Sequence, residues 1–139
     1  MMSDVFFFVP GEPQGKGRPR FVRQTGRTYT PEKTATYENL VKVQFMAVAQ
    51  GQRFSDIAQL AMRLRINYSI PKSVSAKKRS NMLLGIEKPV KRPDASNVLK
   101  AIEDGLNRVA YRDDAQIVYV EITKRYAEQP GVDVHLWEL

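Results

Sequence analysis

Apolar and polar residues alternate with a period of two in four segments of this chain, a pattern typical of β-strands. Residues 4–9 form a short, largely apolar run that ends at Pro10, and residues 60–70 alternate strictly with the apolar positions on one face. Residues 118–122 and 132–136 repeat the alternation later in the chain. We expect a strand at each of the four segments, and the last two can form a hairpin.

Apolar residues that recur every three or four positions predict helices between these strands. Thr30-Pro31 resembles an N-cap followed by proline at the first helical position. The stripe that follows consists of Tyr37, Leu40, Val41, Phe45 and Val48. Residues 73–84 form a short, basic candidate helix, and a further helix is expected over residues 96–109. Its apolar stripe consists of Val98, Leu99, Ile102, Leu106 and Val109.

The expected order of elements is β-α-β-(α)-α-β-β within a single domain, residues 1–139. Because a hairpin can close the chain, the sheet need not be all parallel. We therefore expect an α+β fold with two layers: a small mixed sheet of about four strands and two or three helices. Residues 11–29, rich in Gly, Pro and Arg, are expected to form a loop rather than long regular structure.

Composition narrows the chemistry that this domain can perform. The 139 residues are 42% hydrophobic, which is enough for one core. The chain has no cysteine and one histidine, so disulfides, thiolate zinc sites and histidine-rich metal clusters are excluded. Any metal must be held by oxygen, and the absence of cysteine fits a reducing compartment. The apolar run at residues 5–9 is too short to span a membrane.

The net charge of +7 and pI near 9.8 indicate a polyanionic partner. Residues 14–33 hold six basic side chains and one acid, and residues 71–92 hold seven and one. Residues 94–114 hold five acids and three bases. Two basic arms around an acidic centre suit an enzyme that acts on nucleic acid, although solvated loops explain such charge runs equally well. The candidate DNA-binding residues are Lys16, Arg18, Arg20, Arg23, Lys77, Lys78, Arg79, Lys91 and Arg92.

The acidic centre places carboxylates on both sides of the helix expected over residues 96–109. Asp94 precedes this helix, Asp113-Asp114 follows it, and Lys100 lies four residues after Ser96, so its ammonium group can reach the start of the helix. Two or three carboxylates can anchor a hydrated Mg²⁺, and a lysine can stabilise a phosphoryl transition state. A purely structural interpretation stays open. In it, Asp94 or Ser96 is an N-cap, Asp113-Asp114 forms a turn, and Lys100 pairs with Asp104 at i+4.

Ordered motifs across most of the chain resemble the RusA-type Holliday junction resolvases. Residues 92–118 contain Pro-Asp-x-x-Asn-x-x-Lys and end in Tyr-Arg-Asp-Asp-x-Gln-Ile-Val, and Asp104 lies in the helix between them. Gly-Lys-Gly-Arg-Pro-Arg at residues 15–20 and Tyr-Thr-Pro at residues 29–31 extend the similarity toward the N-terminus. Each motif is short, but the ordered set is fairly specific.

The resemblance implies a homodimeric, magnesium-dependent endonuclease that resolves four-way DNA junctions by paired symmetric incisions, in recombination and repair. It also implies a cytoplasmic bacterial protein, and such proteins are often encoded by phages or prophages. It makes Asp94 and Asp114 metal-binding carboxylates and Lys100 the catalytic lysine. The family pattern is Asp-x-Asp-Asn, and here Ser96 replaces the second acid. A serine hydroxyl can ligate magnesium but brings no charge to the cation, and Asp113 or Asp104 could compensate. The alternative is therefore a junction-binding protein that cuts DNA weakly or not at all.

Two other functions fit the residues less well. Residues 11–17 resemble a phosphate loop, but the spacing between the glycines is one residue short and Pro19 prevents an immediate helix. A basic RNA- or ribosome-associated protein explains the net charge but gives no reason for carboxylates around a helix that carries Lys100. We assign no chemistry to the lone His135, which alternates with Asp133 and Trp137 on one strand face.

Overall fold

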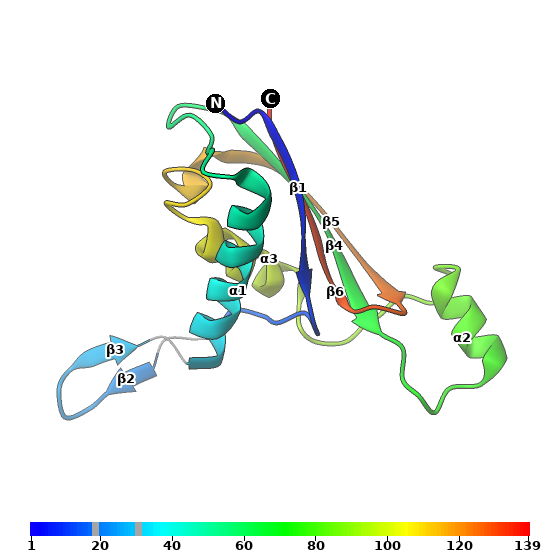
Figure 1. Ribbon diagram of the computed structural model, residues 1–139. Coiled ribbons are helices and arrows are strands. Elements are labelled where there is room, and N and C mark those ends of the chain that lie inside the picture. The colour runs from blue at the N-terminus through cyan, green and yellow to red at the C-terminus, as the bar shows by residue number, and fades with distance from the viewer. Residues whose placement is uncertain (18–19, 30–31) are drawn as a thin grey trace.

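Four strands form one mixed sheet in the computed structural model, which describes residues 1–17, 20–29 and 32–139 (Figure 1). The strands are β1 (Asp4–Pro10), β4 (Leu60–Ser69), β5 (Ile117–Ala127) and β6 (Gly131–Glu138), and their order in the sheet is β1-β6-β4-β5. Strand β6 is antiparallel to both β1 and β4, whereas β4 and β5 are parallel. The α+β, two-layer prediction with a four-stranded mixed sheet is confirmed.

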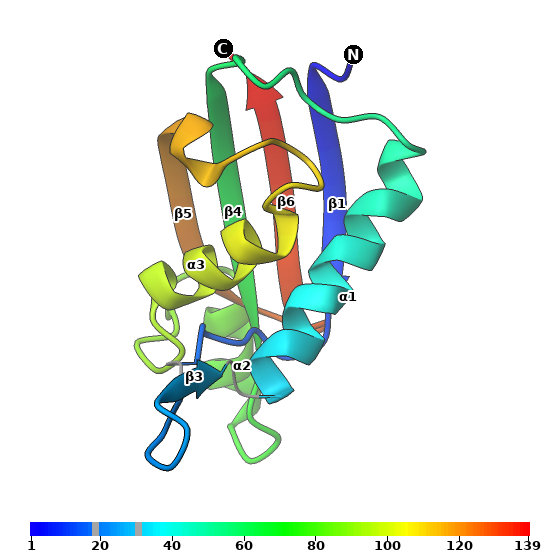
Figure 2. The ribbon, with the colours of Figure 1, turned by 90° about the vertical axis from the view of Figure 1, so that its left-hand side faces the viewer.

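Two helices, α1 (Glu32–Ala49) and α3 (Ala95–Leu106), cover one face of this sheet (Figure 2). The alternating apolar residues of β4, from Leu60 to Tyr68, are buried beneath them, because every second side chain of the strand points to the helical layer. Ile70, the last residue of the predicted alternation, lies beyond β4 and is half-buried. Helix α1 buries Tyr37, Val41 and Phe45 as predicted, but Val48 is exposed and Ala49 is buried instead. The core therefore lies between one face of the sheet and the two helices.

Two smaller elements project away from this core at the lower end of the molecule in Figure 1. One is the hairpin of β2 (Arg20–Val22) and β3 (Arg27–Tyr29), which lies in the segment predicted to be a loop. The other is α2 (Ala76–Leu83), the short basic helix expected from the sequence, which begins at the N-cap Ser75. Hairpin and helix project to opposite sides of the sheet. The predicted N-cap at Thr30-Pro31 lies outside the described residues.

The last two strands do not form the hairpin that their spacing allowed. Strand β4 lies between them, so that Leu64 is paired with Ile122 of β5 on one side and with Val134 of β6 on the other. The chain from β4 to β5 therefore makes a crossover of the kind that parallel neighbours require, and this crossover contains α2, α3 and the 3₁₀ turn η1 (Asp114–Gln116). None of the helices in the described residues is long and apolar enough to cross a membrane.

Candidate active site

Helix α3 carries the candidate catalytic residues on a polar face, and its opposite face is apolar and buried. Val98, Ile102 and Leu106 are buried against the sheet, at helical spacing. The opposite face carries Ser96, Lys100, Glu103 and Asp104, which follow the i, i+4, i+7 and i+8 spacing of one stripe. Ser96 and Lys100 are exposed, whereas Glu103 and Asp104 are half-buried. A rigid, well-packed helix thus holds a polar row at the surface.

The start of α3 is anchored by two neighbouring segments. The hydroxyl of Tyr68, at the end of β4, donates a hydrogen bond of 2.5 Å to the carbonyl oxygen of Pro93. Gly15 lies so close to α3 that an added Cβ would be 3.0 Å from the Cβ of Asn97, and the amide of Lys16 donates to the Asn97 carbonyl at 3.0 Å. The N-terminal segment is therefore docked across the first turn of the helix.

Asp94 occupies the N-cap position of α3 without performing the capping bond. Its backbone is extended, its side chain is exposed, and it makes no side-chain hydrogen bond to the helix N-terminus. Serine and aspartate at an N-cap ordinarily accept a bond from the second or third helical amide. The Asp94 carboxylate is consequently available to bind something other than its own helix.

Asp113 and Asp114 differ in what their carboxylates do. Asp113 accepts a hydrogen bond of 2.9 Å from the amide of Ala115, and Gln116 accepts from the amide of Asp113, so the pair forms a capping box for η1. The pKa of Asp113 is lowered most by the bond from Ala115, then by a side-chain hydrogen bond with Asp114 and by the positive charges of Arg108 and Arg112. Asp114 takes no part in the cap and points to α3 instead.

Lys100 joins α3 to η1 through two carboxylates. Its Nζ lies 3.2 Å from Asp104 and 3.4 Å from Asp114, and the pairing with Asp104 first, then Asp114, raises its pKa. The i+4 contact with Asp104, which the purely structural interpretation contains, is present. The ammonium group does not reach toward Ser96 at the start of the helix, because both of its acidic partners lie in the other direction.

Lys16 extends this row of alternating charges to α1. Its Nζ lies 3.0 Å from Asp104 and 2.5 Å from Glu38. Partial burial lowers the pKa of Lys16, but the two carboxylates outweigh burial and raise it above its ordinary value. This candidate DNA-binding side chain is therefore held within the protein, and Asp104 is shared between Lys16 and Lys100.

Glu103 is a titratable residue of the site that sequence reasoning did not select. Burial of the side chain, together with the nearby charge of Asp114, raises its pKa to about 7, whereas Lys100 partly offsets this effect. Position 103 lies on the same stripe of the helix as Lys100 and Asp104, so the spacing of the charged residues could have identified Glu103 as a candidate. The signal was missed because the burial of Glu103 and its proximity to Asp114 are tertiary features, which spacing within one helix does not reveal.

The oxygen atoms of the site meet only some of the requirements for binding a divalent cation. Asp94, Ser96 and Asp114 offer the hard oxygen atoms that Mg²⁺ prefers, and two carboxylates with water suffice to anchor it. Within residues 1–17, 20–29 and 32–139, however, no three acidic or imidazole side chains converge on one point. No described contact joins Asp94 to Asp114: the first lies beside Tyr68, and the second beside Lys100.

The remaining basic candidates divide between the two projecting elements. Arg23 is exposed on the β2–β3 hairpin, and Lys77 is exposed at the start of α2. Lys78 and Arg79 pair with Glu87 and Glu128, and the Lys91 ammonium lies 5.7 Å from the ring centre of Tyr126. Arg92 is exposed immediately before the site, Arg18 lies outside the described residues, and the side chain of Arg20 is not described.

Carboxylates and a lysine on an exposed helix face, between two basic projections, are features of an enzyme that cleaves a phosphodiester backbone. The family model described as Endodeoxyribonuclease RusA matches residues 10–136, and the chain therefore belongs to the RusA family. The uncharacterized protein YqaN of Bacillus subtilis (strain 168) is 33% identical over 144 residues, a match that covers 99% of each chain. The protein is thus an endodeoxyribonuclease of the Holliday junction resolvase class, whose substrate is branched DNA.

Proposed function

We propose that this protein resolves four-way DNA junctions by paired, symmetric, magnesium-dependent incisions, with α3 and η1 forming the catalytic site. The observation that carries the proposal is the pairing of Lys100 with Asp114, two residues from separate elements that meet on the exposed face of α3. Both positions fall within the segment that resembles the family motif. No packing requirement explains two charged groups that converge at the surface, or an Asp94 carboxylate that leaves the same helix uncapped.

Asp94 and Asp114 are the proposed ligands of the metal, with the Ser96 hydroxyl as a neutral oxygen donor. Asp113 is the less available candidate, because its carboxylate caps η1. When bound, Mg²⁺ would lower the pKa of an attacking water and offset the charge that develops on the scissile phosphate. Water then attacks phosphorus, the bond to the leaving oxygen breaks, and the hydrolysis leaves a phosphate and a hydroxyl end.

Lys100 acts on the phosphate during this reaction. Its raised pKa keeps the ammonium group protonated at neutral pH, and its two carboxylate partners hold it above the surface of α3. A fixed positive charge at this position stabilises the negative charge of the transition state more than that of the ground state. On the side of α1, Glu38 pairs with Lys16, and Lys16 pairs with Asp104. These ion pairs restrain the row of charged side chains to which Lys100 belongs.

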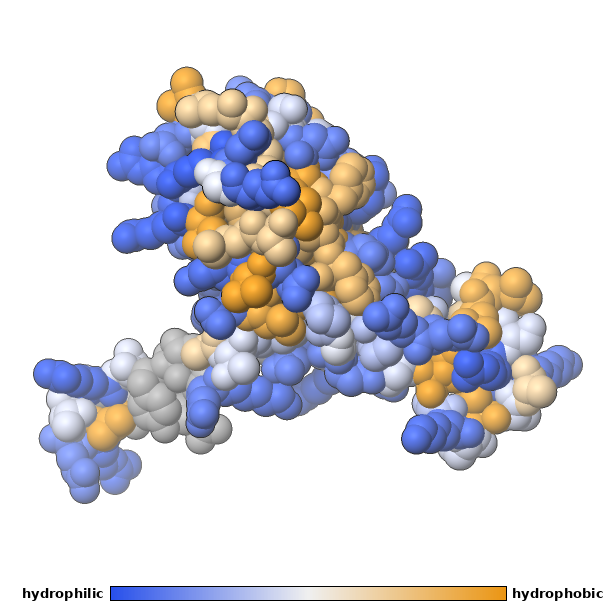
Figure 3. All heavy atoms as spheres, viewed as in Figure 1, coloured by the Kyte–Doolittle hydropathy of each residue, from blue (hydrophilic) through white to orange (hydrophobic). Residues whose placement is uncertain are grey.

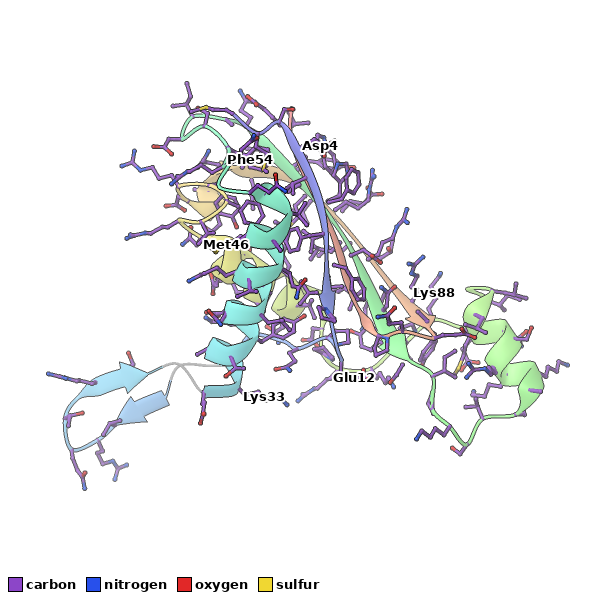
Figure 4. All side chains as sticks on the ribbon, in the orientation of Figure 1. Asp4, Glu12, Lys33, Met46, Phe54 and Lys88 are labelled. Atoms are coloured by element: carbon purple, nitrogen blue, oxygen red, sulfur yellow. The ribbon has the colours of Figure 1, made fainter. Side chains whose placement is uncertain are left out.

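The test is cleavage of a synthetic four-way junction with magnesium, beside a matched linear duplex. Asp94→Asn, Asp114→Asn and Lys100→Ala should each reduce cleavage by roughly 100-fold or more while binding to the junction persists. Glu12→Gln, an exposed acid on the loop after β1 (Figure 4), is the matched control and should cut normally. Wild-type cleavage rates in either aspartate variant would show that the metal site lies elsewhere.

A second candidate function is junction binding without efficient cleavage. Ser96 and the lack of three converging acidic groups within the described residues favour it, because both weaken metal binding. The same assay separates the candidates: a wild-type protein that binds the junction tightly but leaves it intact across a magnesium titration is a binding protein.

A further inference from the structure

The side chain of Lys16 is occupied within the protein, although its place in a basic segment suggests a contact with DNA. Only 20% of this side chain is exposed, compared with 53% for Lys100. Figure 3 shows that the β2–β3 hairpin, which follows Lys16 in the chain, is mainly hydrophilic at its tip, and the hairpin carries the exposed residues Arg23 and Arg27. Positive charge is therefore presented to solvent elsewhere, and the position of Lys16 needs another explanation.

The backbone around Lys16 is fixed to both helices of the covering layer. The amide of Lys16 donates to the carbonyl oxygen of Asn97 on α3 at 3.0 Å, and the amide of Gly17 donates to the hydroxyl of Thr34 on α1 at 3.0 Å. Thr34 is itself buried. The Lys16 side chain therefore starts from a fixed point between α1 and α3.

The crossing of these helices brings two carboxylates to the same point. Gly105 permits the close approach, because an added Cβ would lie 2.9 Å from the carbonyl oxygen of Glu38. Glu38 of α1 and Asp104 of α3 each have only 20% of the side chain exposed, and both contact the ammonium group of Lys16. Two partly buried carboxylates that lie close together repel each other unless a cation joins them. Lys16 supplies that cation.

Asp104 divides its two carboxylate oxygens between two lysines. Its Oδ2 lies 3.0 Å from the Nζ of Lys16, and its Oδ1 lies 3.2 Å from the Nζ of Lys100. Lys100 also contacts Asp114, at the slightly longer distance of 3.4 Å. The pair with Asp104 forms within one helix, whereas the pair with Asp114 joins α3 to η1. The attraction that Asp104 exerts on Lys100 therefore decides how Lys100 is shared between the two elements.

We propose that Lys16 is a positioning residue for Lys100: by occupying Asp104, it prevents that carboxylate from drawing the Lys100 ammonium away from Asp114. Without Lys16, both oxygens of Asp104 are available to Lys100, whose flexible four-carbon stem can turn to them. The ammonium is then held along α3, away from η1. This inference rests on the proposed function, in which Lys100 acts on the scissile phosphate.

A purely structural role for Lys16 predicts a different result. If Lys16 only joins α1 to α3, its removal lowers stability and leaves the partners of Lys100 unchanged. If Lys16 positions Lys100, the effect of its removal depends on the charge of Asp104 and disappears once that charge is neutralised. A cycle of variants at positions 16 and 104 therefore separates the two roles.

The first measurement is side-chain NMR of ¹⁵N-labelled protein in chelator, which reports the Lys100 ammonium resonance without metal or cleavage. Lys100→Ala assigns this resonance, and Asp114→Asn gives its position when Asp104 is the remaining partner. In Lys16→Met the resonance should move from its wild-type position toward its position in Asp114→Asn. In Lys16→Met/Asp104→Asn it should coincide with its position in Asp104→Asn, because residue 104 no longer competes.

The second measurement is the single-turnover rate of junction cleavage at saturating protein, beside the dissociation constant of the junction. Lys16→Met should cut on the order of 10-fold more slowly, because a misplaced catalytic group slows the reaction. The dissociation constant should not change, since Lys16 does not contact DNA. In the Asp104→Asn background, the same substitution should change the rate by less than about 2-fold. Lys16→Arg, which keeps the charge between the carboxylates, should retain most of the rate.

Two further variants act as controls, with circular dichroism to confirm that each protein is folded. Lys33→Met removes the same charge from the exposed first turn of α1 (Figure 4), where Lys33 makes no ion pair with a described residue, and should leave the Lys100 resonance in place. Lys16→Met/Glu38→Gln removes one acid together with the lysine, so the test continues if Lys16→Met does not fold. It should still shift the Lys100 resonance.

A Lys100 resonance that stays in place in the folded Lys16 variants would overturn the inference, as would shifts of equal size with and without the charge of Asp104. Weaker junction binding by Lys16→Met, with a less negative salt dependence, would identify Lys16 as a DNA contact and also overturn it. A wild-type protein that does not cut the junction would contradict the proposed function alone, because the NMR cycle does not depend on cleavage.

Discussion

Lys100 and Asp94 illustrate how far individual residues of the site could be predicted. The Lys100–Asp104 pair follows from helical spacing alone, and it is present at 3.2 Å. The contact of Lys100 with Asp114 could not be predicted, because it depends on where η1 returns to α3 after a separation of 14 residues. Spacing likewise could not reveal that Asp94 leaves its helix uncapped or that Lys16 is bound between two carboxylates.

Replacing Ser96 by Asp should strengthen metal binding at the start of α3. The new carboxylate lies two residues from Asp94, so the two repel each other in the absence of a cation and share one in its presence. We expect the melting temperature of Ser96→Asp to fall below that of wild type in chelator and to rise with magnesium, as ligand linkage requires. Junction cleavage should rise at low magnesium.

The control for this change is Ser73→Asp, which adds the same charge at an exposed position before α2. Its melting temperature should not respond to magnesium. If Ser96→Asp shows neither metal-dependent stabilisation nor faster cleavage, residue 96 does not face the metal and its assignment as a ligand is wrong.

Glu103 should make the stability of the protein depend on pH. Its pKa is about 7 in the folded protein, above the 4.5 of an unperturbed glutamate, so the folded state binds more protons between these values. Stability should therefore fall as pH rises from about 4.5 to about 7 and should level off above that. Because the side chain is half-exposed and screened by water, we expect a contribution on the order of 1 kcal/mol.

The variant Glu103→Gln isolates this effect, since an amide does not titrate. Denaturant unfolding at pH 4 and pH 8 should show that the variant gains stability relative to wild type at pH 8 only. Equal differences at both pH values would mean that burial does not perturb Glu103.

Helices α1 and α3 cross so closely at Gly105 that only glycine fits there without displacing atoms of α1. A Cβ at this position would lie 2.8 Å from the Cβ of Val41 and 2.9 Å from the carbonyl oxygen of Glu38. Glycine in a helix is ordinarily unfavourable, by about 1 kcal/mol relative to alanine. The close approach of the two helices is therefore the reason for its presence in α3.

Gly105→Ala should lower the melting temperature despite its better helix propensity. Overpacking typically costs about 1–3 kcal/mol, which exceeds the gain from propensity, because the clashing atoms include backbone that cannot rotate away. Asn39→Ala on the exposed side of α1 supplies the comparison, with the propensity gain and no clash. A Gly105→Ala protein as stable as Asn39→Ala would contradict the close crossing.

The elements themselves were predictable where one face is buried and the other is not. Strand β4 follows its expected pattern, and helix α3 follows its own from Val98 to Leu106, because packing against a core imposes the periods of two and 3.6. Helix α3 ends at Leu106, however, before the predicted last position Val109. The burial of β5 does not follow the alternation expected from its sequence. Val118 and Val120 are exposed because β5 is an edge strand that the helices cover incompletely. The β2–β3 hairpin was missed because three-residue strands outside the core carry no such period.

At the scale of the whole molecule, the hairpin and α2, which both carry basic side chains, project away from the core to opposite sides of the sheet (Figure 1). Since Lys16 is paired with Glu38 and Asp104, the exposed arginines of the hairpin are better placed to bind phosphates than Lys16. Binding through them releases counterions from DNA, so affinity should fall steeply as salt rises.

Replacing both Arg23 and Arg27 by Ser should weaken junction binding and reduce its dependence on salt. If each side chain neutralises one phosphate, the slope of log affinity against log salt should become less negative by about 1.8. Arg53→Ser serves as the control, because Arg53 pairs with Asp56 away from the hairpin. An unchanged slope in the double variant would remove the hairpin from the DNA interface.

Strand β6 imposes an order of events on the synthesis of this nuclease. It is paired with β1 and β4 on its two sides, yet it follows every other described element in the chain. While a ribosome is making the protein, α3 and its lysine emerge before the strand that completes the sheet beneath them. The nascent chain therefore carries the proposed catalytic residues before the sheet that positions them is complete.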